Sequence, residues 1–261
     1  MLRSLWDYRG YVRASVAREL RLRYAGSVLG ALWQVIAPLA LIATYTLVFS
    51  ELMRARLHGI EDRYAYAIYV CCALLPWSMF AEILTRSQTM FLDQANLLKK
   101  SNFPRICVPV TVTGAALANF AIVYAVFGFL LLAASRWPGM VVIGALVPLT
   151  IFAILGASLG VLLGVAHVFF RDIGQVLGIV LQIWFWMAPI AYPSDMLAPP
   201  YDRWIAANPV TPIVIAFQDI FVRRRWPEWG ALAYPAVVGI VLAALALLAF
   251  RRESPQIVDE L

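Results

Sequence analysis

The stretch Phe169-Phe170-Arg171-Asp172-Ile173-Gly174-Gln175 joins a charged turn to a long apolar run. The run continues through residues 176–193 and ends in clustered aromatic side chains, Trp184-Phe185-Trp186 and Tyr192. A helix needs about 20 mostly apolar residues to cross the hydrocarbon core of a bilayer. The run therefore predicts a membrane span over 173–192, with the charged turn at one bilayer face and the aromatic end at the other.

The composition of the whole chain is that of a membrane protein. Hydrophobic residues make up 62% of the 261 residues, charged residues make up 14%, and the mean hydropathy is +0.79. Soluble domains are far more polar. We expect one domain over 1–261, an all-α polytopic membrane protein with six transmembrane helices. The six apolar runs cover 31–50, 65–84, 106–134, 140–170, 173–192 and 231–250.

The arginines and lysines predict the orientation of these spans. Most of them lie in the N-terminal segment, the loop 85–105, the turn 171–172 and the C-terminal tail. Loops rich in these residues stay in the cytoplasm, so both termini are predicted to be cytoplasmic. We assign the net charge of +6 to contact with membrane lipid, with no nucleic acid as a partner. The first apolar run follows a long Arg-rich segment, so we expect it to stay as a helix and not to be a cleaved signal.

Three segments outside the spans have recognisable patterns. Residues 8–24 carry apolar side chains at helical spacing among arginines, which predicts an N-terminal amphipathic helix at the membrane interface. Apolar anchors between charges predict a short cytoplasmic helix over 87–100. The proline-rich segment 194–229 has apolar patches too short to span, which favours re-entrant helices between spans 5 and 6.

The candidate chemical motifs favour packing over catalysis. Residues 156–160 match G-x-S-x-G, but that nucleophile motif requires a strand-turn-helix, and here it lies within an apolar helix. Gly156, Gly160 and Gly164 share one helix face, as do Gly174 and Gly178, and we expect close helix contact there. Glu82 is expected to pair with Arg86. We identify no catalytic residues and no metal site, and we expect the three cysteines to be buried thiols.

The chain also lacks a G-x-x-x-x-G-K-[ST] phosphate-binding loop, since its two lysines, Lys99 and Lys100, follow a pair of leucines and no glycine. It shows no chain of intramembrane carboxylates of the kind that couples transport to ions. If this protein moves a substrate with ATP, the energy must therefore come from a partner subunit.

The order of these features resembles the bacterial polysaccharide ABC exporter permeases, the membrane subunits that serve O-antigen, teichoic acid and some capsules. The likeness is carried by Arg21-Leu22-Arg23-Tyr24-Ala25-Gly26-Ser27-Val28-Leu29-Gly30-Ala31-Leu32-Trp33, Phe169-Phe170-Arg171-Asp172-Ile173, the Trp-Phe-Trp end of the fifth span, and Asn208-Pro209. It covers nearly the whole chain. The Arg-rich, Lys-poor composition favours O-antigen within this family.

The resemblance implies a multi-pass permease of the bacterial inner membrane. A second copy of the chain and two copies of a cytoplasmic ATPase subunit would complete the exporter. The ATPase would bind ATP and Mg, with no cofactor in this chain, and a lipid-linked polysaccharide would pass from cytoplasm to periplasm. A polytopic enzyme acting on lipid-linked sugars and a self-sufficient channel remain alternatives, although an enzyme should show a convergent cluster of acid, base or metal-binding groups.

By the same resemblance, residues 23–30 correspond to a gate at the cytoplasmic entrance, and 87–100 to the helix that couples to the ATPase. Arginines near the entrance can bind a lipid-linked phosphate through forked hydrogen bonds, or anionic lipid in general. The entrance candidates are Arg18, Arg21, Arg23, Tyr24, Gly26 and Gly30. The coupling candidates are Phe91, Leu97, Leu98, Lys99, Lys100, Arg171 and Asp172.

A channel for a sliding glycan needs flat aromatic surfaces for sugar rings. Trp184 and Trp186 lie about 9 to 12 Å inside Tyr192 if the helix is continuous, deeper than a headgroup belt requires. Interfacial anchoring is the alternative role for such residues. The channel candidates are Tyr45, Phe49, Tyr66, Tyr69, Trp184, Trp186 and Tyr192.

Overall fold

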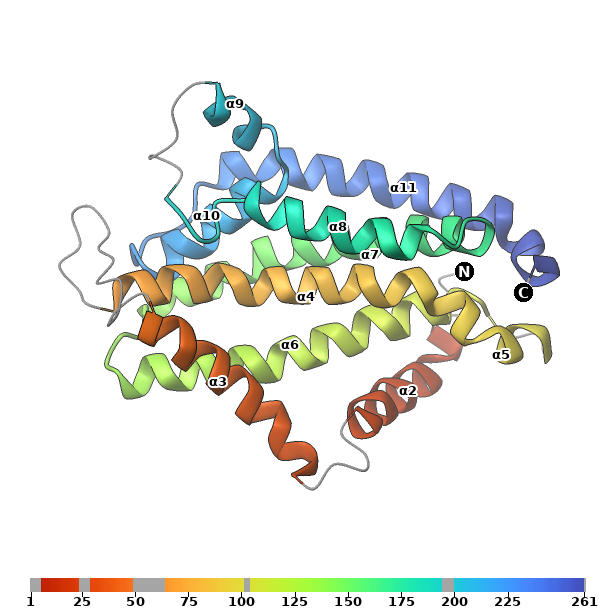
Figure 1. Cartoon of the computed structure of the whole chain (residues 1–261), viewed down its shortest axis with the longest axis horizontal. Coiled ribbons are helices and arrows are strands. Elements are labelled where there is room, and N and C mark those ends of the chain that lie inside the picture. Colours follow the sequence, from red (N-terminus) through yellow and green to blue (C-terminus); the bar gives the residue numbers. More distant parts are fainter. Residues whose placement is uncertain (1–5, 24–28, 49–63, 101–103, 194–199, 261) are drawn as a thin grey trace.

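Long apolar helices form the body of the bundle in a computed structural model of the chain (Figure 1). The structure describes residues 6–23, 29–48, 64–100, 104–193 and 200–260. Within these residues, four predicted spans are confirmed as helices long and apolar enough to cross a membrane. They are α4 (Ala65–Asp93), α6 (Cys107–Ala133), α7 (Leu146–Phe169), which the 3-10 segment η3 (Gly139–Ala145) precedes, and α11 (Trp229–Glu260).

The other two predicted spans form shorter helices. The segment 31–50 yields η1 (Gly30–Leu32) and α3 (Trp33–Thr46), and the segment 173–192 yields α8 (Ile173–Trp186). Each α-helix has 14 residues, fewer than the roughly 20 that span a bilayer unaided. The predicted helix does not continue from Trp186 to residue 192, because Pro189 cannot donate a backbone hydrogen bond and disfavours helix at the residue before it.

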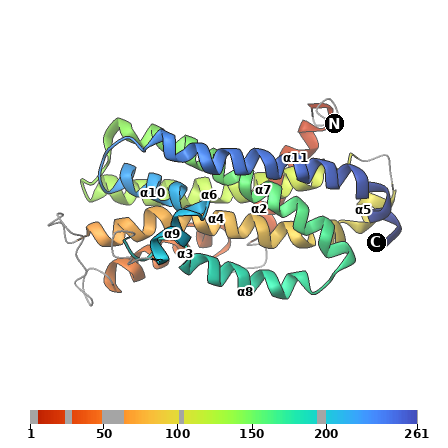
Figure 2. The same ribbon diagram turned by 90° about the horizontal axis from the view of Figure 1, so that it is seen from above.

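Short helices occupy the two ends of the bundle. Residues 8–24, predicted as one helix, contain α2 (Arg9–Leu22). The predicted helix 87–100 is in fact two elements, because α4 continues to Asp93 and α5 (Ala95–Lys100) follows a non-helical Gln94. The segment 194–229 contains α9 (Tyr201–Ala206) and the apolar α10 (Val210–Phe221). The helix α5 and the end of α11 lie at the same end of the bundle (Figures 1 and 2).

The helix α4 is the centre of the core. In its most apolar window 78% of residues are buried, against 22 to 39% for the other long helices. It contacts α3, α6, α7, α8 and α10. Figure 2 shows α8 at the margin of the bundle, where Leu177 is its buried residue. The core therefore forms around α4 and leaves most of α8 exposed.

Close contact between α4 and α7 depends on the glycines that the sequence singled out. A Cβ at Gly160 would lie 2.6 Å from Ser87 Oγ, and a Cβ at Gly164 would lie 2.6 Å from the Ser87 carbonyl oxygen. Neither separation is possible between real atoms, so α7 can approach α4 only because these positions have no side chain. At Gly178 a Cβ would meet nothing within 4 Å, so the packing expected at Gly178 is not found within the described residues.

The serine of the G-x-S-x-G motif has an ordinary structural role. Ser158 is buried within α7, and its hydroxyl donates a hydrogen bond of 2.7 Å to the Ile154 carbonyl. The surroundings are helical, unlike the strand-turn-helix that a nucleophile of this motif requires. The motif is therefore a packing pattern.

Replacing Gly164 by Ala should lower the free energy of unfolding by about 1–3 kcal/mol, because the added methyl overpacks the contact with the α4 backbone. The matched control Gly178→Ala should leave stability unchanged or raise it by up to about 1 kcal/mol, since alanine is the better helix former and space is open there. Thermal unfolding of both variants in detergent measures the difference. Equal stability of the two variants would contradict the packing account.

Candidate functional site

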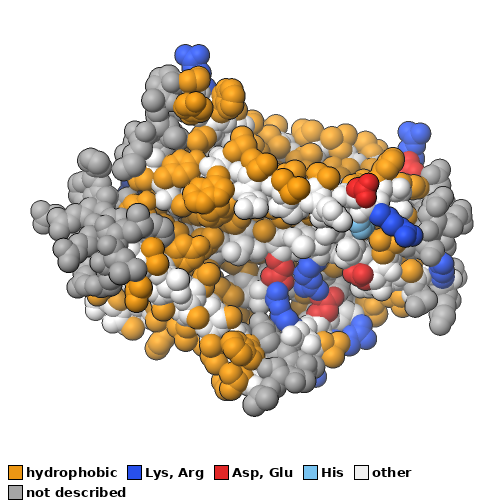
Figure 3. Space-filling view, in the orientation of Figure 1, with side chains coloured by type: hydrophobic (Ala, Val, Ile, Leu, Met, Phe, Trp, Pro, Cys, Tyr) orange, Lys and Arg blue, Asp and Glu red, His pale blue; other side chains and the backbone are white. Residues whose placement is uncertain are grey.

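A cluster of charged and polar side chains joins α2, α4 and α6. Arg23 Nη1 lies 3.0 Å from Glu82 Oε1, and Arg86 Nη1 lies 3.6 Å from the same oxygen. Arg86 also pairs with Glu19 of α2, and Asn119 Nδ2 donates to Glu82 Oε2 at 2.9 Å. Figure 3 shows acidic and basic side chains gathered at this place on a largely apolar face. We refer to these five residues as the Arg–Glu cluster.

The Arg–Glu cluster fixes α2 against the bundle. The predicted pair of Glu82 with Arg86 is confirmed, and Arg23 and Glu19 extend it across to α2. The Glu82 side chain is only 14% exposed, and such a carboxylate is stable when charged partners and hydrogen bonds surround it. The cluster holds two arginines and two glutamates, so its charges balance.

The predicted entrance residues differ in their charge pairing and exposure. Arg23 is already neutralised by Glu82, whereas Arg18 and Arg21 are exposed on α2. Gly30 has a φ of +48°, a left-handed conformation that favours glycine and starts η1. Tyr24 and Gly26 lie outside the described residues.

The two predicted channel tryptophans of α8 have different surroundings. Trp184 is half-buried, its ring lies edge-on to Phe80 at 5.3 Å, and its indole N–H donates to Asn208 Oδ1 at 3.0 Å. Trp186 is 60% exposed. Trp184 is therefore bonded into the core, and Trp186 is the member of the pair that is open to a partner or substrate.

Tyrosine hydroxyls hold the turn that follows α8. Tyr66 donates to the Ala191 carbonyl at 2.7 Å, and Tyr69 donates to the Tyr192 carbonyl at 3.0 Å. The Tyr192 hydroxyl in turn donates to the Trp186 carbonyl at 2.7 Å. The helical depth predicted for the tryptophans is not observed, because the chain folds back after Trp186 and brings Tyr192 beside it. Of the other channel candidates, Tyr45 packs against the core and Phe49 lies outside the described residues.

Asn208 makes several structural hydrogen bonds, a role that the sequence alone did not predict. Its Oδ1 accepts hydrogen bonds from Trp184 and from the Val210 N–H at 3.0 Å, and its Nδ2 donates to the Met187 carbonyl at 3.1 Å. It is 7% exposed. The Asn-Pro dipeptide was a usable signal, because asparagine favours helix starts and proline favours the first helical position. Asn208 thus ties the end of α8 to the start of α10.

A second missed residue is Asp219 at the end of α10. It is 2% exposed, and its carboxylate accepts hydrogen bonds from Arg223 at 2.8 Å and from Arg225 at 2.9 and 3.1 Å. Arg225 also donates its backbone N–H to the Asp219 carbonyl. The Asp-Arg spacing of four residues was the available signal. This buried carboxylate organises the turn between α10 and α11.

The predicted coupling residues divide into anchors and exposed groups. Phe91 is 1% exposed and stacks on Phe250 of α11 at 5.9 Å, and Leu98 is 4% exposed. Leu97 is half-buried, and Lys100 is the last residue of α5. The exposed members of the set are Lys99, Arg171 and Asp172. Phe91 and Leu98 belong to one buried cluster that anchors α5, and the charges of Lys99, Arg171 and Asp172 are exposed.

The cysteines are buried thiols, as predicted. Cys71, Cys72 and Cys107 are buried and free. Within the described residues no group of three histidine, cysteine or acidic side chains is arranged to hold a metal ion.

Residues 11–222 match the family model of the ABC-2 type transporters. The match covers most of the chain, which therefore belongs to this family of transporter membrane subunits. Together with its long apolar helices, this makes the chain a multi-pass protein of the inner membrane, and the family implies an ABC ATPase partner.

Similar proteins carry names from polysaccharide export. The O-antigen export system permease protein RfbA of Myxococcus xanthus is 30% identical over 257 residues, which cover 97% of this chain and 96% of that protein. The protein of the same name from Klebsiella pneumoniae is 25% identical over 90% of this chain and 88% of its own length. The polysialic acid transport protein KpsM of Escherichia coli is 22% identical over 92% of both chains.

Replacing Asn208 by Ala should lower the free energy of unfolding by about 1–3 kcal/mol, because two N–H donors and one carbonyl lose their partner. Trp184→Phe, which removes the indole donor together with part of the ring, should cost about 1 kcal/mol or less through that bond. The double variant should show a loss smaller than the sum of the single losses, since the two residues share a hydrogen bond. Strict additivity in a denaturation experiment would show that the bond contributes nothing.

Proposed function

We propose that this chain is the permease subunit of an ATP-driven exporter that moves a lipid-linked polysaccharide, most like O-antigen, from the cytoplasm to the periplasm. The supporting observation is the 30% identity to an O-antigen export permease along 97% of the chain. Export of a capsular polymer is the second candidate, favoured by the likeness to the polysialic acid transport protein. Deleting the gene should remove the glycan from the cell surface and leave lipid-linked polymer inside, and the chemistry of that polymer distinguishes the two. Normal surface glycans in the deletion strain would overturn the proposal.

The proposed assembly is a homodimer with two ATPase subunits and six spans in each permease chain. In this arrangement α3 and α8 complete the six spans together with the residues that flank them, α2 lies along the membrane interface, and 194–229 is re-entrant. Both termini lie in the cytoplasm. The concentration of exposed Lys99, Arg171, Arg251 and Arg252 at the end of the bundle that carries α5 supports this orientation.

The ATPase is proposed to dock at α5 and the turn between α7 and α8. Support comes from the combination of buried anchors, Phe91 and Leu98, with exposed charges, Lys99, Arg171 and Asp172. Buried anchors make this surface rigid, and exposed charges provide specificity for a partner.

The glycan is proposed to pass along the exposed face of α8. Val176, Ile179 and Ile183 are each more than half exposed, and Trp186 ends the same helix. A second copy of the chain would enclose this face, and the indole of Trp186 would offer a flat surface to sugar rings. The exposed Arg18 and Arg21 on α2 are the proposed contacts for the lipid-linked phosphate at the entrance.

Replacing Trp186 by Ala should reduce export roughly threefold to tenfold, because one stacking surface is lost. The protein level should stay normal, since the side chain is 60% exposed. Trp229→Ala, at an exposed tryptophan of α11, is the control and should leave export unchanged. The measurement is surface glycan per membrane-inserted permease, and equal ratios for the two variants would exclude Trp186 from the channel.

Replacing Lys99 and Arg171 by Glu should weaken binding of the ATPase about tenfold, or ~1.4 kcal/mol, through charge reversal at the docking surface. Both side chains are exposed, so the permease should still fold. The control Arg203→Glu, at an exposed residue of α9, should not affect binding. Co-purification with titrated ATPase measures the effect, and undiminished binding by the double variant would contradict this docking surface.

A further inference from the structure

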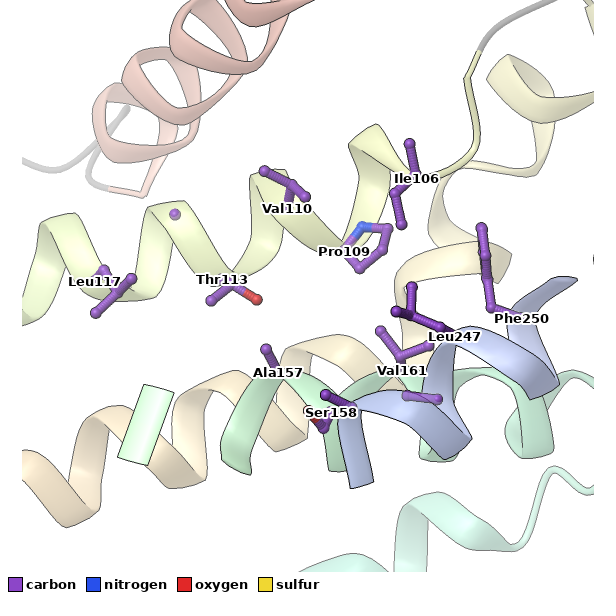
Figure 4. Close-up of a pocket in the computed structure, with 13 residues that line it drawn as sticks. Ile106, Pro109, Val110, Thr113, Leu117, Ala157, Ser158, Val161, Leu247 and Phe250 are labelled. Atoms are coloured by element: carbon purple, nitrogen blue, oxygen red, sulfur yellow. The ribbon is translucent and has the colours of Figure 1, made fainter. Parts of the chain in front are cut away.

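An apolar groove lies between α6 and α11, with α7 as its floor (Figure 4). Its volume is about 420 Å³. The residues that line it include Ile106, just before α6, and Leu117 of α6, Ala157 and Val161 of α7, and Leu247 and Phe250 of α11. Thr113 and Ser158 are the lining residues with polar side chains, and the Ser158 hydroxyl is already bonded within its own helix. The groove therefore offers packing to an apolar ligand and few hydrogen bonds.

The wall of the groove on the α6 side is about as long as one bilayer leaflet is deep. From Ile106 to Leu117 it follows α6 for about 16 Å at the helical rise of 1.5 Å per residue. Half of a bilayer's hydrocarbon core is about 15 Å thick. Ile106 and Phe250 lie together at one end of the groove, and Leu117 lies at the other (Figure 4). An extended hydrocarbon chain in the groove would therefore begin at the level of Ile106 and end near the middle of the bundle.

Three arginines adjoin, along the chain, the two residues at this end of the groove. Arg105 directly precedes Ile106, and Arg251 and Arg252 directly follow Phe250. Arg251 is exposed, and Arg105 is half-buried. Glu253, the next residue along the chain, lies 3.3 Å from the Arg252 guanidinium. Each guanidinium has five N–H donors and can bind a phosphate while it keeps a protein partner.

We propose that this groove binds an anionic phospholipid, with one acyl chain between α6 and α11 and the phosphate head group at Arg105 and Arg251. The length of the α6 wall, the apolar lining and the adjoining arginines together match the shape and charge of such a lipid, and basic pockets between membrane helices bind anionic head groups. The helix α11 packs chiefly on α7, whereas α6 packs chiefly on α4. The acyl chain would therefore fill the space between α6 and α11. The site is separate from the face of α8 proposed for the glycan.

The experiment is native mass spectrometry of the purified full-length permease with phosphatidylglycerol or phosphatidylethanolamine added to the detergent. The wild type should retain one phosphatidylglycerol per chain in preference to phosphatidylethanolamine. Arg105→Gln with Arg251→Gln should reduce phosphatidylglycerol affinity about 30-fold and remove the preference. The control Arg203→Gln with Arg224→Gln removes the same charge from exposed residues outside the groove and should retain the preference.

A second pair of variants tests the groove itself. Ala157→Phe fills the floor of the groove and should abolish retention of either lipid, whereas Ala244→Phe, at an exposed residue of α11 outside the lining, should retain it. Equal retention of the two lipids by the wild type, or wild-type retention by Ala157→Phe, would overturn the proposal. A loss of dimer in Ala157→Phe with lipid retention intact would also overturn it, because the groove would then be an interface between copies. If Ala157→Phe fails to fold, the comparison of the Arg105/Arg251 and Arg203/Arg224 variants still tests the proposal.

Discussion

The contact of α7 with α4 at Gly160 and Gly164 determines how the rest of the bundle is arranged. Because no side chain separates the helices there, the Ser87 region of α4 lies directly against α7. The opposite side of α7 receives α11, where a Cβ at Gly239 would lie 3.5 Å from Ile154 and 3.6 Å from Leu155. The stack of α4, α7 and α11 thus depends on glycines at the α4–α7 contact, whereas the α7–α11 contact leaves room for a Cβ. Every functional candidate is attached to this stack, either directly or through one further helix.

Both ends of α4 hold neighbouring functional candidates in place. Tyr66 and Tyr69, near its first residues, bond the turn after α8, and Glu82 and Arg86, nearer its end, bond α2. A shift of α4 would therefore move the exposed face of α8 and the arginines of α2 together. This linkage offers a physical route by which a partner at α5 can influence the proposed path of the glycan, since α5 follows α4 after a single non-helical residue.

The sequence predicted the features that depend on composition and spacing. The long apolar helices, the glycine face of α7, the Glu82–Arg86 pair and the buried cysteines follow from hydropathy and helical periodicity, and all are present. The end of α8 was not predicted, because Pro189 lies in a run whose composition remains apolar on both sides. The roles of Asn208 and Asp219 depend on partners that tertiary folding brings together. Pairing of Arg23 with Glu82 is likewise a contact between distant segments, which periodicity cannot reveal.

In the proposed function, this chain moves a lipid-linked polysaccharide with energy from a separate ATPase. The most direct measurement is transport in proteoliposomes that contain the purified permease, its ATPase and a lipid-linked glycan. Accessibility of the glycan to an external lectin or glycosidase reports its position. The account predicts ATP-dependent movement across the bilayer that requires both proteins. Movement at the same rate without the ATPase, or no movement when the complete complex hydrolyses ATP, would contradict it.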